Sequence, residues 1–421
     1  MDKEVKSETF INGNGKVHFS NRTIYSTKMI NYEFNRFFYT DIIKLLLNVF
    51  EERLIIPELK VMQLYTLTFS GFQNIRSAIG ENGYLNPVAD NIVCEFEYNN
   101  VFYLADFHVE VDRVKQTHYT MNFSYPDTQT ADERIGHKLL RIAFEHTSDF
   151  KNGCCEISLP FGEREAISYL DVNFVKPHKS SLENIFIRED IKSDIKRFIY
   201  AFKNYDKHKI PLRYLLSGKP GLGKTEVIRS IIAECSDFGC VIIPNEMSGA
   251  DWLVFEFAKL FKPALVCIDD IDLIFGRRES INGKKSLNHF LTMLDGILQN
   301  KFFLIATTND KKLVDIAASR PGRFDEVIDF GELEKKYYKN LIRERTNNNH
   351  IVELFEDDIM DYMESKKVTG AYIVNLVKQI IIIKEMNPAF SKDDLLKYIN
   401  RNHKGFYTSQ IEREKQFGFS K

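Results

Sequence analysis

The segment "GKPGLGKT", residues 218–225, limits the folds open to this chain more than any other stretch. It follows the apolar run "RYLLS" and precedes "EVIRSIIAEC", whose pattern is typical of a helix. The segment matches the pattern GxxxxGKS/T in full. Its glycines let the backbone curl so that N–H groups point at phosphate oxygens, and the helix that follows adds the positive end of its dipole. A strand, a phosphate-binding loop and a helix in this order predict a parallel α/β sheet.

Two residues at the end of this segment carry the chemistry. Lys224 is expected to contact the β- and γ-phosphates of a nucleotide, and Thr225 to ligate Mg²⁺. The full set of nucleotide-binding residues predicted from the segment is Gly218, Lys219, Pro220, Gly221, Leu222, Gly223, Lys224, Thr225 and Glu226.

A second apolar run, "ALVCIDDIDLIF" at 264–275, ends in acids. At the carboxyl end of a strand in such a sheet, a carboxylate reaches the crevice where ligands bind. Asp269 is therefore the candidate Mg²⁺-associated carboxylate, and Asp270 is the candidate that polarises an attacking water. The alternative is that both are helix-capping or solvated acids. This alternative is more plausible for Asp270 than for Asp269. In such sites a glutamate usually contacts the attacking water, and the shorter aspartate side chain must reach the same water.

Two further segments supply neutral and cationic groups. In "FFLIATTND" (302–310), Asn309 would hydrogen-bond the γ-phosphate or the water without adding charge, or else would simply form a turn. In "SRPGRFD" (319–325), Arg320 and Arg323 flank a Pro-Gly turn. Arginine suits phosphate because its guanidinium is planar, multidentate and always charged. The alternative is an ordinary surface turn.

These segments, in this order, resemble those of the AAA family of ATPases. "GKPGLGKT" looks like the Walker A motif of the family, "LVCIDDID" like its Walker B motif, "ATTN" like its sensor 1 and "RPGRFD" like its arginine-finger region. "SLNHFLTMLDGI" (286–297) is similar to the helix before the sensor strand, and "TGAYIVNLV" (369–377) to the opening of the α-helical lid. The resemblance covers about residues 182–385.

The resemblance implies an ATPase that uses ATP and Mg²⁺. The catalytic residues that it implies are Asp269, Asp270, Asn309, Arg320 and Arg323, and the metal ligands are Thr225 and Asp269. Both arginines would act in trans on the nucleotide of a neighbouring subunit, which requires a homo-oligomeric ring, a hexamer or heptamer.

The segments "SLENIFIREDIKSDIKRFI" (181–199) and "YDKHKIPLRYLLSGKPGLGKT" (205–225) carry a finer resemblance. They look like the AAA subgroup that contains the mitochondrial translocase of the Rieske iron–sulfur protein. That subgroup also has Asp at the second acidic position, usually with Glu before it, and often a β-rich domain before the ATPase. It has an amino-terminal membrane span, for which this chain has no segment. The first pore loop, "NEMSGAD" (245–251), has Met247 where many protein-threading members carry an aromatic residue, and Trp252 is better explained by core packing.

Hydrophobic periodicity divides the chain into three zones and a tail. Residues 1–180 begin with a helix at 34–54 and continue as alternating strands, which predicts an α+β domain. The resemblance to the AAA family implies that this domain binds a substrate or adaptor. Residues 181–332 alternate apolar strands with helices, the pattern of a P-loop α/β core. Residues 333–400 are helical throughout and would form the lid, and 401–421 form a tail.

Composition and local sequence argue against a disordered chain, a disulfide-stabilised protein and a membrane-spanning protein. Of 421 residues, 44% are hydrophobic and 28% charged, with a net charge of −2, as in soluble globular proteins. The six cysteines form no CxxC pair, which favours reduced structural thiols. No signal peptide or membrane span is visible, because the run "IIII" at 380–383 is far short of the roughly 20 residues that a span needs. We expect a cytoplasmic protein.

Three functional hypotheses follow. The first is an oligomeric ATPase that remodels or translocates a protein. The second is a nucleic-acid motor: the acidic balance of 1–180 argues against it, while the basic segment "GRRESINGKK" (276–285), otherwise a solvated charge run, keeps it open. The third is an ATP-gated scaffold with weak hydrolysis, motivated by Asp270. No HExxH motif is present, which excludes an attached metalloprotease of that type.

Overall fold

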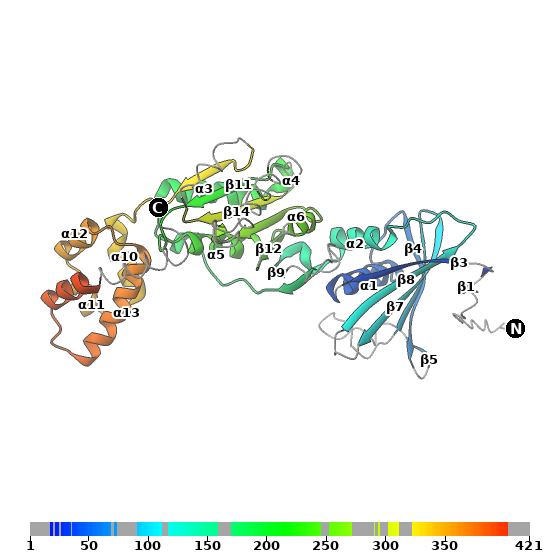
Figure 1. Ribbon diagram of the computed structural model, residues 1–421, viewed down its shortest axis with the longest axis horizontal. Coiled ribbons are helices and arrows are strands. Elements are labelled where there is room, and N and C mark those ends of the chain that lie inside the picture. The colour runs from blue at the N-terminus through cyan, green and yellow to red at the C-terminus, as the bar shows by residue number, and fades with distance from the viewer. Residues whose placement is uncertain are drawn as a thin grey trace, which may run out of the picture. The chain divides into compact units, whose positions relative to one another are not determined.

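The computed structural model describes residues 17–19, 22–24, 27–34, 36–68, 71–73, 91–111, 117–158, 170–245, 252–271, 290, 294, 302–310 and 322–402. The chain forms two compact units. The N-terminal unit comprises Met1–Lys151 and Pro160–Val172, and the P-loop unit comprises Asn152–Leu159 and Asn173–Lys421. Figure 1 shows the elements of both.

The N-terminal unit is built on a six-stranded sheet in the order β3-β8-β7-β6-β4-β5, whose neighbouring strands pair antiparallel. The strands are β3 (Thr27–Phe34), β4 (Leu59–Thr68), β5 (Gly71–Gln73), β6 (Asn91–Tyr98), β7 (Val101–Val111) and β8 (Thr117–Pro126). β1 (Val17–Phe19) and β2 (Arg22–Ile24) form a separate pair. The helix expected at 34–54 is confirmed as α1 (Arg36–Phe50).

Aromatic side chains fill the space between this sheet and its helices. α1 packs against β4 and against α2 (Ile135–His146). Phe38 of α1 lies edge-on to Phe144 of α2 at 5.4 Å between ring centroids, and Phe107 lies edge-on to Phe123 across two strands at 6.3 Å. All four rings are buried. These aromatic residues therefore form much of the core of the N-terminal unit.

The P-loop unit contains a seven-stranded sheet in the order β10-β9-β12-β13-β14-β11-β15. From β9 to β15 all pairs are parallel. The strands are β9 (Gly153–Ser158), β10 (Asp171–Phe174), β11 (Arg213–Ser217), β12 (Cys240–Pro244), β13 (Ala264–Ile268), β14 (Phe303–Thr308) and β15 (Glu326–Asp329). The predicted parallel α/β core is confirmed.

β9 differs from the domain division proposed from the sequence. That division assigns residues before 181 to the N-terminal domain, whereas β9 pairs with β12 in the P-loop sheet, with Cys154 opposite Val241. The physical reason is burial. Cys154, Cys155 and Ile157 are each no more than 2% exposed, so this strand covers an edge that β12 would otherwise leave open.

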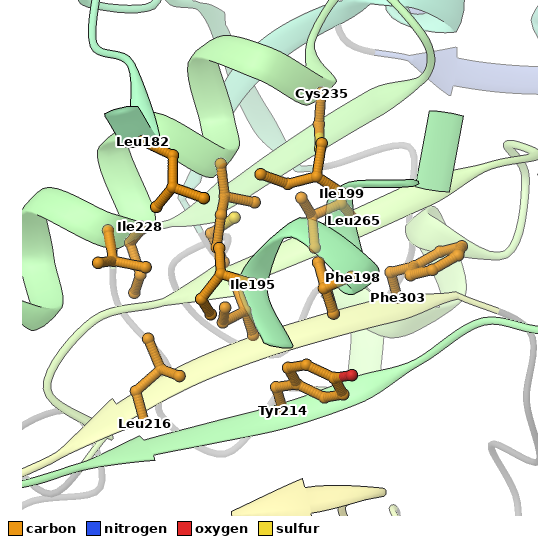
Figure 2. Packing of buried hydrophobic residues seen from close by; sticks show 14 of the residues in the cluster. Leu182, Ile195, Phe198, Ile199, Tyr214, Leu216, Ile228, Cys235, Leu265 and Phe303 are labelled. Carbon is orange, nitrogen blue, oxygen red and sulfur yellow. The ribbon is translucent and has the colours of Figure 1, made fainter. Parts of the chain in front are cut away.

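Two helices cover one face of the sheet. In Figure 2, Ile195, Phe198 and Ile199 of α3 (Glu189–Lys203) and Ile228 of α5 (Lys224–Cys235) lie over Tyr214, Leu216 and Phe303 of the strands. Alternate strand residues that face the other way, such as Leu215 and Leu304, are also fully buried. Both faces of the sheet are therefore covered, as parallel sheets require.

The carboxyl-terminal helices form a separate core within the P-loop unit. They are η5 (Lys335–Tyr337), α10 (Tyr338–Arg345), α11 (Asn349–Leu354), α12 (Asp357–Ser365), α13 (Gly370–Met386) and a helical stretch at 392–402. Ile342, Ile373 and Leu395 are fully buried at its centre. We call this helical layer, residues 333–402, the lid; its helical structure agrees with the expectation for residues 333–400.

Two further properties bear on the sequence predictions. In the described part of the chain, none of the helices combines the length and apolar character that crossing a bilayer requires. All six cysteines are free thiols in the interior. Burial raises the pKa of Cys267 well above its usual value, so this thiol stays protonated and unreactive.

Candidate nucleotide-binding site

Three adjacent strands end at the same place in the P-loop unit. β11, β14 and β13 are neighbours and run parallel, so their carboxyl ends meet at one edge of the sheet. The phosphate-binding loop follows β11, Asp269 and Asp270 follow β13, and Asn309 follows β14. The sheet therefore brings together three segments that lie apart in the sequence.

The loop between β11 and α5 has the backbone that its glycines permit. Gly218, Gly221 and Gly223 have φ of 147°, 82° and 95°, a region that side-chain-bearing residues rarely adopt. A Cβ atom at Gly223 would meet nothing within 4 Å, so this glycine borders open space. A Cβ atom at Gly221 would lie 2.9 Å from Cβ of Ala371, in the first turn of α13 of the lid. The loop is thus open on one side and packed against the lid on the other.

Lys224 is directed into the loop. Its side chain is buried, and Nζ donates to the carbonyl oxygens of Gly218 (2.6 Å) and Lys219 (3.0 Å) and to Oδ1 of Asn309 (2.8 Å). The ammonium group therefore lies among the backbone groups that would surround a phosphate. The structure brings Lys224 and Asn309 into direct contact, although 85 residues separate them.

The acids after β13 are tied to β14. Oδ1 of Asp269 accepts a hydrogen bond from the Thr307 hydroxyl at 2.5 Å, and Oδ1 of Asp270 accepts one from the Asn309 amide at 2.9 Å. The backbone N–H of Asp270 donates to Oγ1 of Thr307 at 2.7 Å. Asn309 thus links the Lys224 ammonium to the Asp270 carboxylate. Thr307 is a residue that sequence reasoning missed, because a threonine inside an apolar strand carries no signal by itself.

A cavity of about 710 Å³ lies over the loop, within the usual range for ligand pockets. From the core it is lined by Pro220, Gly221, Leu222, Gly223, Lys224, Thr225, Glu226, Asp270 and Asn309. The segment 179–186 and the lid supply the rest, including Ile185, Phe186, Gly370 and Val374. Sequence reasoning missed the 179–186 side. Its only signal is the apolar pair Ile185–Phe186, which a core would explain equally well.

The residues present fit a nucleotide with Mg²⁺. Gly223 opens onto free space, where a Cβ atom would stand, and the buried ammonium of Lys224 lies beside it in the sequence. The Thr225 hydroxyl and the Asp269 carboxylate are oxygen donors, the ligand type that Mg²⁺ prefers. Apolar side chains that line the same cavity, among them Ile185 and Val374, suit a base.

The other predicted residues lie around this centre. Thr225 is partly buried at the start of α5, and the exposed Glu226 forms an ion pair with Arg229 at 2.7 Å. Lys219 is exposed and lies 3.9 Å from Glu332. Met247 and the segments 276–285 and 311–321 fall outside the described residues.

The two arginines of the predicted finger region differ. Arg320 lies outside the described residues. Arg323 is buried at 5% exposure, a position that favours a structural role within its own chain. Its assignment as a finger stays a prediction. A charged side chain that is this deeply buried requires polar or charged partners inside the protein.

A buried arginine at the start of β11 anchors this region. Nη1 of Arg213 donates to the carbonyl oxygens of Leu294 (3.2 Å) and Gly322 (3.3 Å), and its backbone N–H donates to Asp325 at 2.7 Å. Burial lowers the pKa of the Arg213 guanidinium, while the charge of Asp325 raises it. Arg213 therefore fixes the start of the segment that leads into β15.

Comparison with known proteins supports this site. Residues 214–332 match the family model for the ATPase family associated with various cellular activities (AAA). The chain is 30% identical over 211 residues to Protein mac-1 of Caenorhabditis elegans, which covers 46% of this chain and 26% of that protein. It is 25% identical over 230 residues to the ATP-dependent zinc metalloprotease FtsH of Halothermothrix orenii, covering 49% and 36%. It is 26% identical over 225 residues to the mitochondrial inner membrane i-AAA protease supercomplex subunit YME1 of Saccharomyces cerevisiae, covering 49% and 30%.

The chain spans between about a quarter and two fifths of the length of the curated relatives it matches. A solved structure, the FIGL-1 AAA domain, aligns with a TM-score of 0.41 and 20% identity, covering 56% of this chain and 90% of that one. The family model spans β11, the loop, the two acids and Asn309, which are the elements that form the site. The part of the chain that forms the site is therefore the part that is similar to the AAA family.

Proposed function

We propose that this protein is an oligomeric ATPase that hydrolyses ATP and uses the energy to remodel or translocate a protein substrate. The observation that carries the proposal is the connected set Lys224–Asn309–Asp270, in which a phosphate-binding cation, a neutral amide and an acid are joined by hydrogen bonds of 2.8 and 2.9 Å. A cation for phosphate and an acid for water, held by one amide, are the groups that phosphoryl transfer to water needs.

Each residue has a separate task in this proposal. The N–H groups of the loop and the Lys224 ammonium bind the phosphates, which replace the carbonyl oxygens that now accept from Nζ. Asp270 orients the attacking water and accepts its proton, and Asn309 holds the Asp270 carboxylate in place. Thr225 and Asp269 would hold Mg²⁺, which when bound neutralises charge on the β- and γ-phosphates.

The assembly completes the site in this proposal. A guanidinium from a neighbouring subunit stabilises the charge of the transition state, and Arg320 is our candidate for it. Such a contact in trans needs a closed homo-oligomeric ring, a hexamer or heptamer. The N-terminal unit would select the protein substrate or an adaptor. Six buried free thiols suit a reducing, cytoplasmic location.

Steady-state ATP hydrolysis with matched variants tests the proposal. Asp270→Asn, which keeps the shape but removes the base, is expected to lower kcat by about 10²-fold or more while ATP binding is retained. Lys224→Ala is expected to lose binding. An Asp270→Asn protein that hydrolyses ATP at the original rate would contradict the role of Asp270.

The same assay separates the alternatives. Turnover stimulated by DNA, and weakening steeply with salt, would favour a nucleic-acid motor. Tight ATP binding without turnover in the unmodified protein would favour a gated scaffold.

A further inference from the structure

Thr307 lies between the two acids, and its hydroxyl is shared by both. Strand register pairs Ile268, the last residue of β13, with Ala306 of β14. The residues that follow these two, Asp269 and Thr307, are therefore neighbours. The Thr307 side chain is fully buried. Its Oγ1 donates to Oδ1 of Asp269 at 2.5 Å and accepts from the N–H of Asp270 at 2.7 Å.

These two bonds use the hydroxyl in both of its capacities. A threonine hydroxyl has one proton to donate and lone pairs to accept, and here the proton goes to Asp269 while a lone pair receives the N–H of Asp270. Donation to a carboxylate fixes the orientation of that carboxylate. Valine has the same shape as threonine but offers neither bond, so both polar groups would lose this buried partner.

The bond to the N–H of Asp270 also supports an uncommon backbone. Asp270 has φ of 49°, in the left-handed region that non-glycine residues seldom occupy. This turn directs the Asp270 carboxylate to the amide of Asn309. Strain of this kind persists only where surrounding contacts hold it, and Thr307 supplies one such contact from the neighbouring strand.

We propose that Thr307 is a positioning residue that sets the geometry of both acids: it orients Asp269 for the metal and holds Asp270 in the turn that aims its carboxylate at the attacking water. This proposal rests on the ATPase activity proposed above. Because Thr307 belongs to β14, the position of Asp270 depends on contacts with β14 as well as on its covalent link to β13. A short aspartate thereby acquires a fixed position at the pocket.

Substitution in the full chain tests this inference. Thr307→Val is expected to lower kcat about tenfold or more, the loss typical of a hydrogen bond to a charged group, while affinity for ADP in EDTA stays within about twofold. Thr307→Ser retains the hydroxyl and should keep kcat within about threefold. A second readout does not depend on turnover: the additional rise in Tm that Mg²⁺ gives to the ADP-bound protein is expected to vanish in Thr307→Val and to persist in Thr307→Ser.

Thr308→Val is the matched control. Thr308 is the next residue of β14, is equally buried, and accepts from the N–H of Asp310 at 3.0 Å instead of from an acid of β13. The Thr308→Val protein should lose about as much thermal stability as the Thr307→Val protein. It should keep both the original kcat and the additional rise in Tm that Mg²⁺ gives to the ADP-bound protein. If Thr307→Val does not fold, Thr307→Ala and Thr307→Ser are compared in its place, with loss expected only in the alanine variant.

Two results would overturn the inference: equal behaviour of Thr307→Val and Thr308→Val, or equal loss in Thr307→Ser and Thr307→Ala. Failure of the ATPase proposal looks different. In that case the unmodified protein has no Mg²⁺-dependent hydrolysis that Lys224→Ala removes, and the Mg²⁺ increment in Tm still tests the placement of Asp269 by Thr307.

Discussion

Asp270 adopts a left-handed backbone conformation, although aspartate lacks the freedom of glycine. The side chain is one methylene shorter than the glutamate usual at this position in such sites. The turn and the hydrogen bond to Asn309 at 2.9 Å together fix where its carboxylate lies. The position that the Asp270 carboxylate can reach is therefore decided by the backbone conformation of this residue as well as by the length of its side chain. Composition and spacing carry no information on this φ angle.

A second residue with unusual surroundings lies in the N-terminal unit. Asp41 of α1 is 3% exposed and accepts from the Ser148 hydroxyl at 2.5 Å. Burial raises its pKa to about 7, opposed by Ser148 and Lys44 and assisted by the negative charge of Asp149. The folded state therefore holds this proton more tightly than the unfolded chain does.

The stability of the protein should respond to pH through Asp41. A carboxyl whose pKa is raised on folding contributes stability at low pH that is lost as pH rises from about 4 to about 7. Asp41→Asn removes this titration and is expected to stabilise the protein by roughly 1–4 kcal/mol at pH 8, with the gain shrinking towards pH 5. Denaturant unfolding at pH 5, 6, 7 and 8 measures it. A gain that is constant across this range would show that Asp41 does not titrate there.

At the scale of elements, the loop and the lid are in contact through their backbones. The N–H of Ala371 at the start of α13 donates to the carbonyl oxygen of Gly221 at 3.1 Å. The hydroxyl of Thr369 caps the same helix by accepting from the N–H of Tyr372 at 3.3 Å. The first turn of α13 is thus joined to the phosphate-binding loop.

A pair of glycine substitutions separates lid contact from loop strain. Gly221→Ala and Gly223→Ala both force a side chain into a left-handed conformation, at about 1–2 kcal/mol each. Only Gly221→Ala also meets Ala371 and Thr369, at 2.9 and 3.0 Å. We expect a larger fall in the Tm of the nucleotide-free protein for Gly221→Ala than for Gly223→Ala. Calorimetry measures both Tm values. Equal decreases in Tm for the two variants would mean that the lid accommodates the added methyl group at Gly221 with no loss of stability.

The sequence predicts the elements that have a local signal and misses those that depend on pairing. β11, β13 and β14 are apolar runs with polar ends, and each is where the pattern puts it. Lys224 and the two acids follow because a motif fixes their spacing. β9 could not be assigned to the P-loop sheet, since "GCCEIS" would suit either domain, and only its pairing with β12 decides. Thr307 and the cavity residues at 179–186 are likewise defined by neighbours distant in sequence.

β9 gives a test of where the P-loop unit begins. A fragment of residues 152–421 keeps the strand that covers β12, whereas a fragment of 181–421 removes it and exposes both apolar surface and unpaired backbone groups. The shorter fragment is expected to unfold at a Tm lower by roughly 5 °C or more. Comparison of the two melting curves at equal concentration checks this. Equal curves would mean that β9 adds nothing to the stability of the sheet.

At the scale of the whole molecule, the proposed ring requires that one subunit complete the site of the next. Lys224 and Arg320 would then serve the same reaction from different chains. Arg320→Ala is expected to abolish hydrolysis while leaving nucleotide binding nearly intact. Arg323→Ala, by contrast, removes a buried side chain and should lower Tm.

Mixing of two inactive variants tests this division of labour. Lys224→Ala subunits retain the arginine, and Arg320→Ala subunits retain the loop. In an equal random mixture roughly a quarter of the interfaces would join an intact loop to an intact arginine, and hydrolysis should return in part. No activity in the exchanged mixture, with ring assembly verified by light scattering, would place Arg320 in its own subunit's site or in the fold.

The seven-stranded sheet ends in two very short strands. β10 and β15 have four residues each and form its outer positions. A long open strand is a template on which another chain can pair, and pairing of that kind has no natural stopping point. A protein that gathers several copies of one sheet into a ring is especially exposed to this hazard. In the proposed ring, the short strands at both borders would leave little open edge on which the sheet of a neighbouring copy could pair.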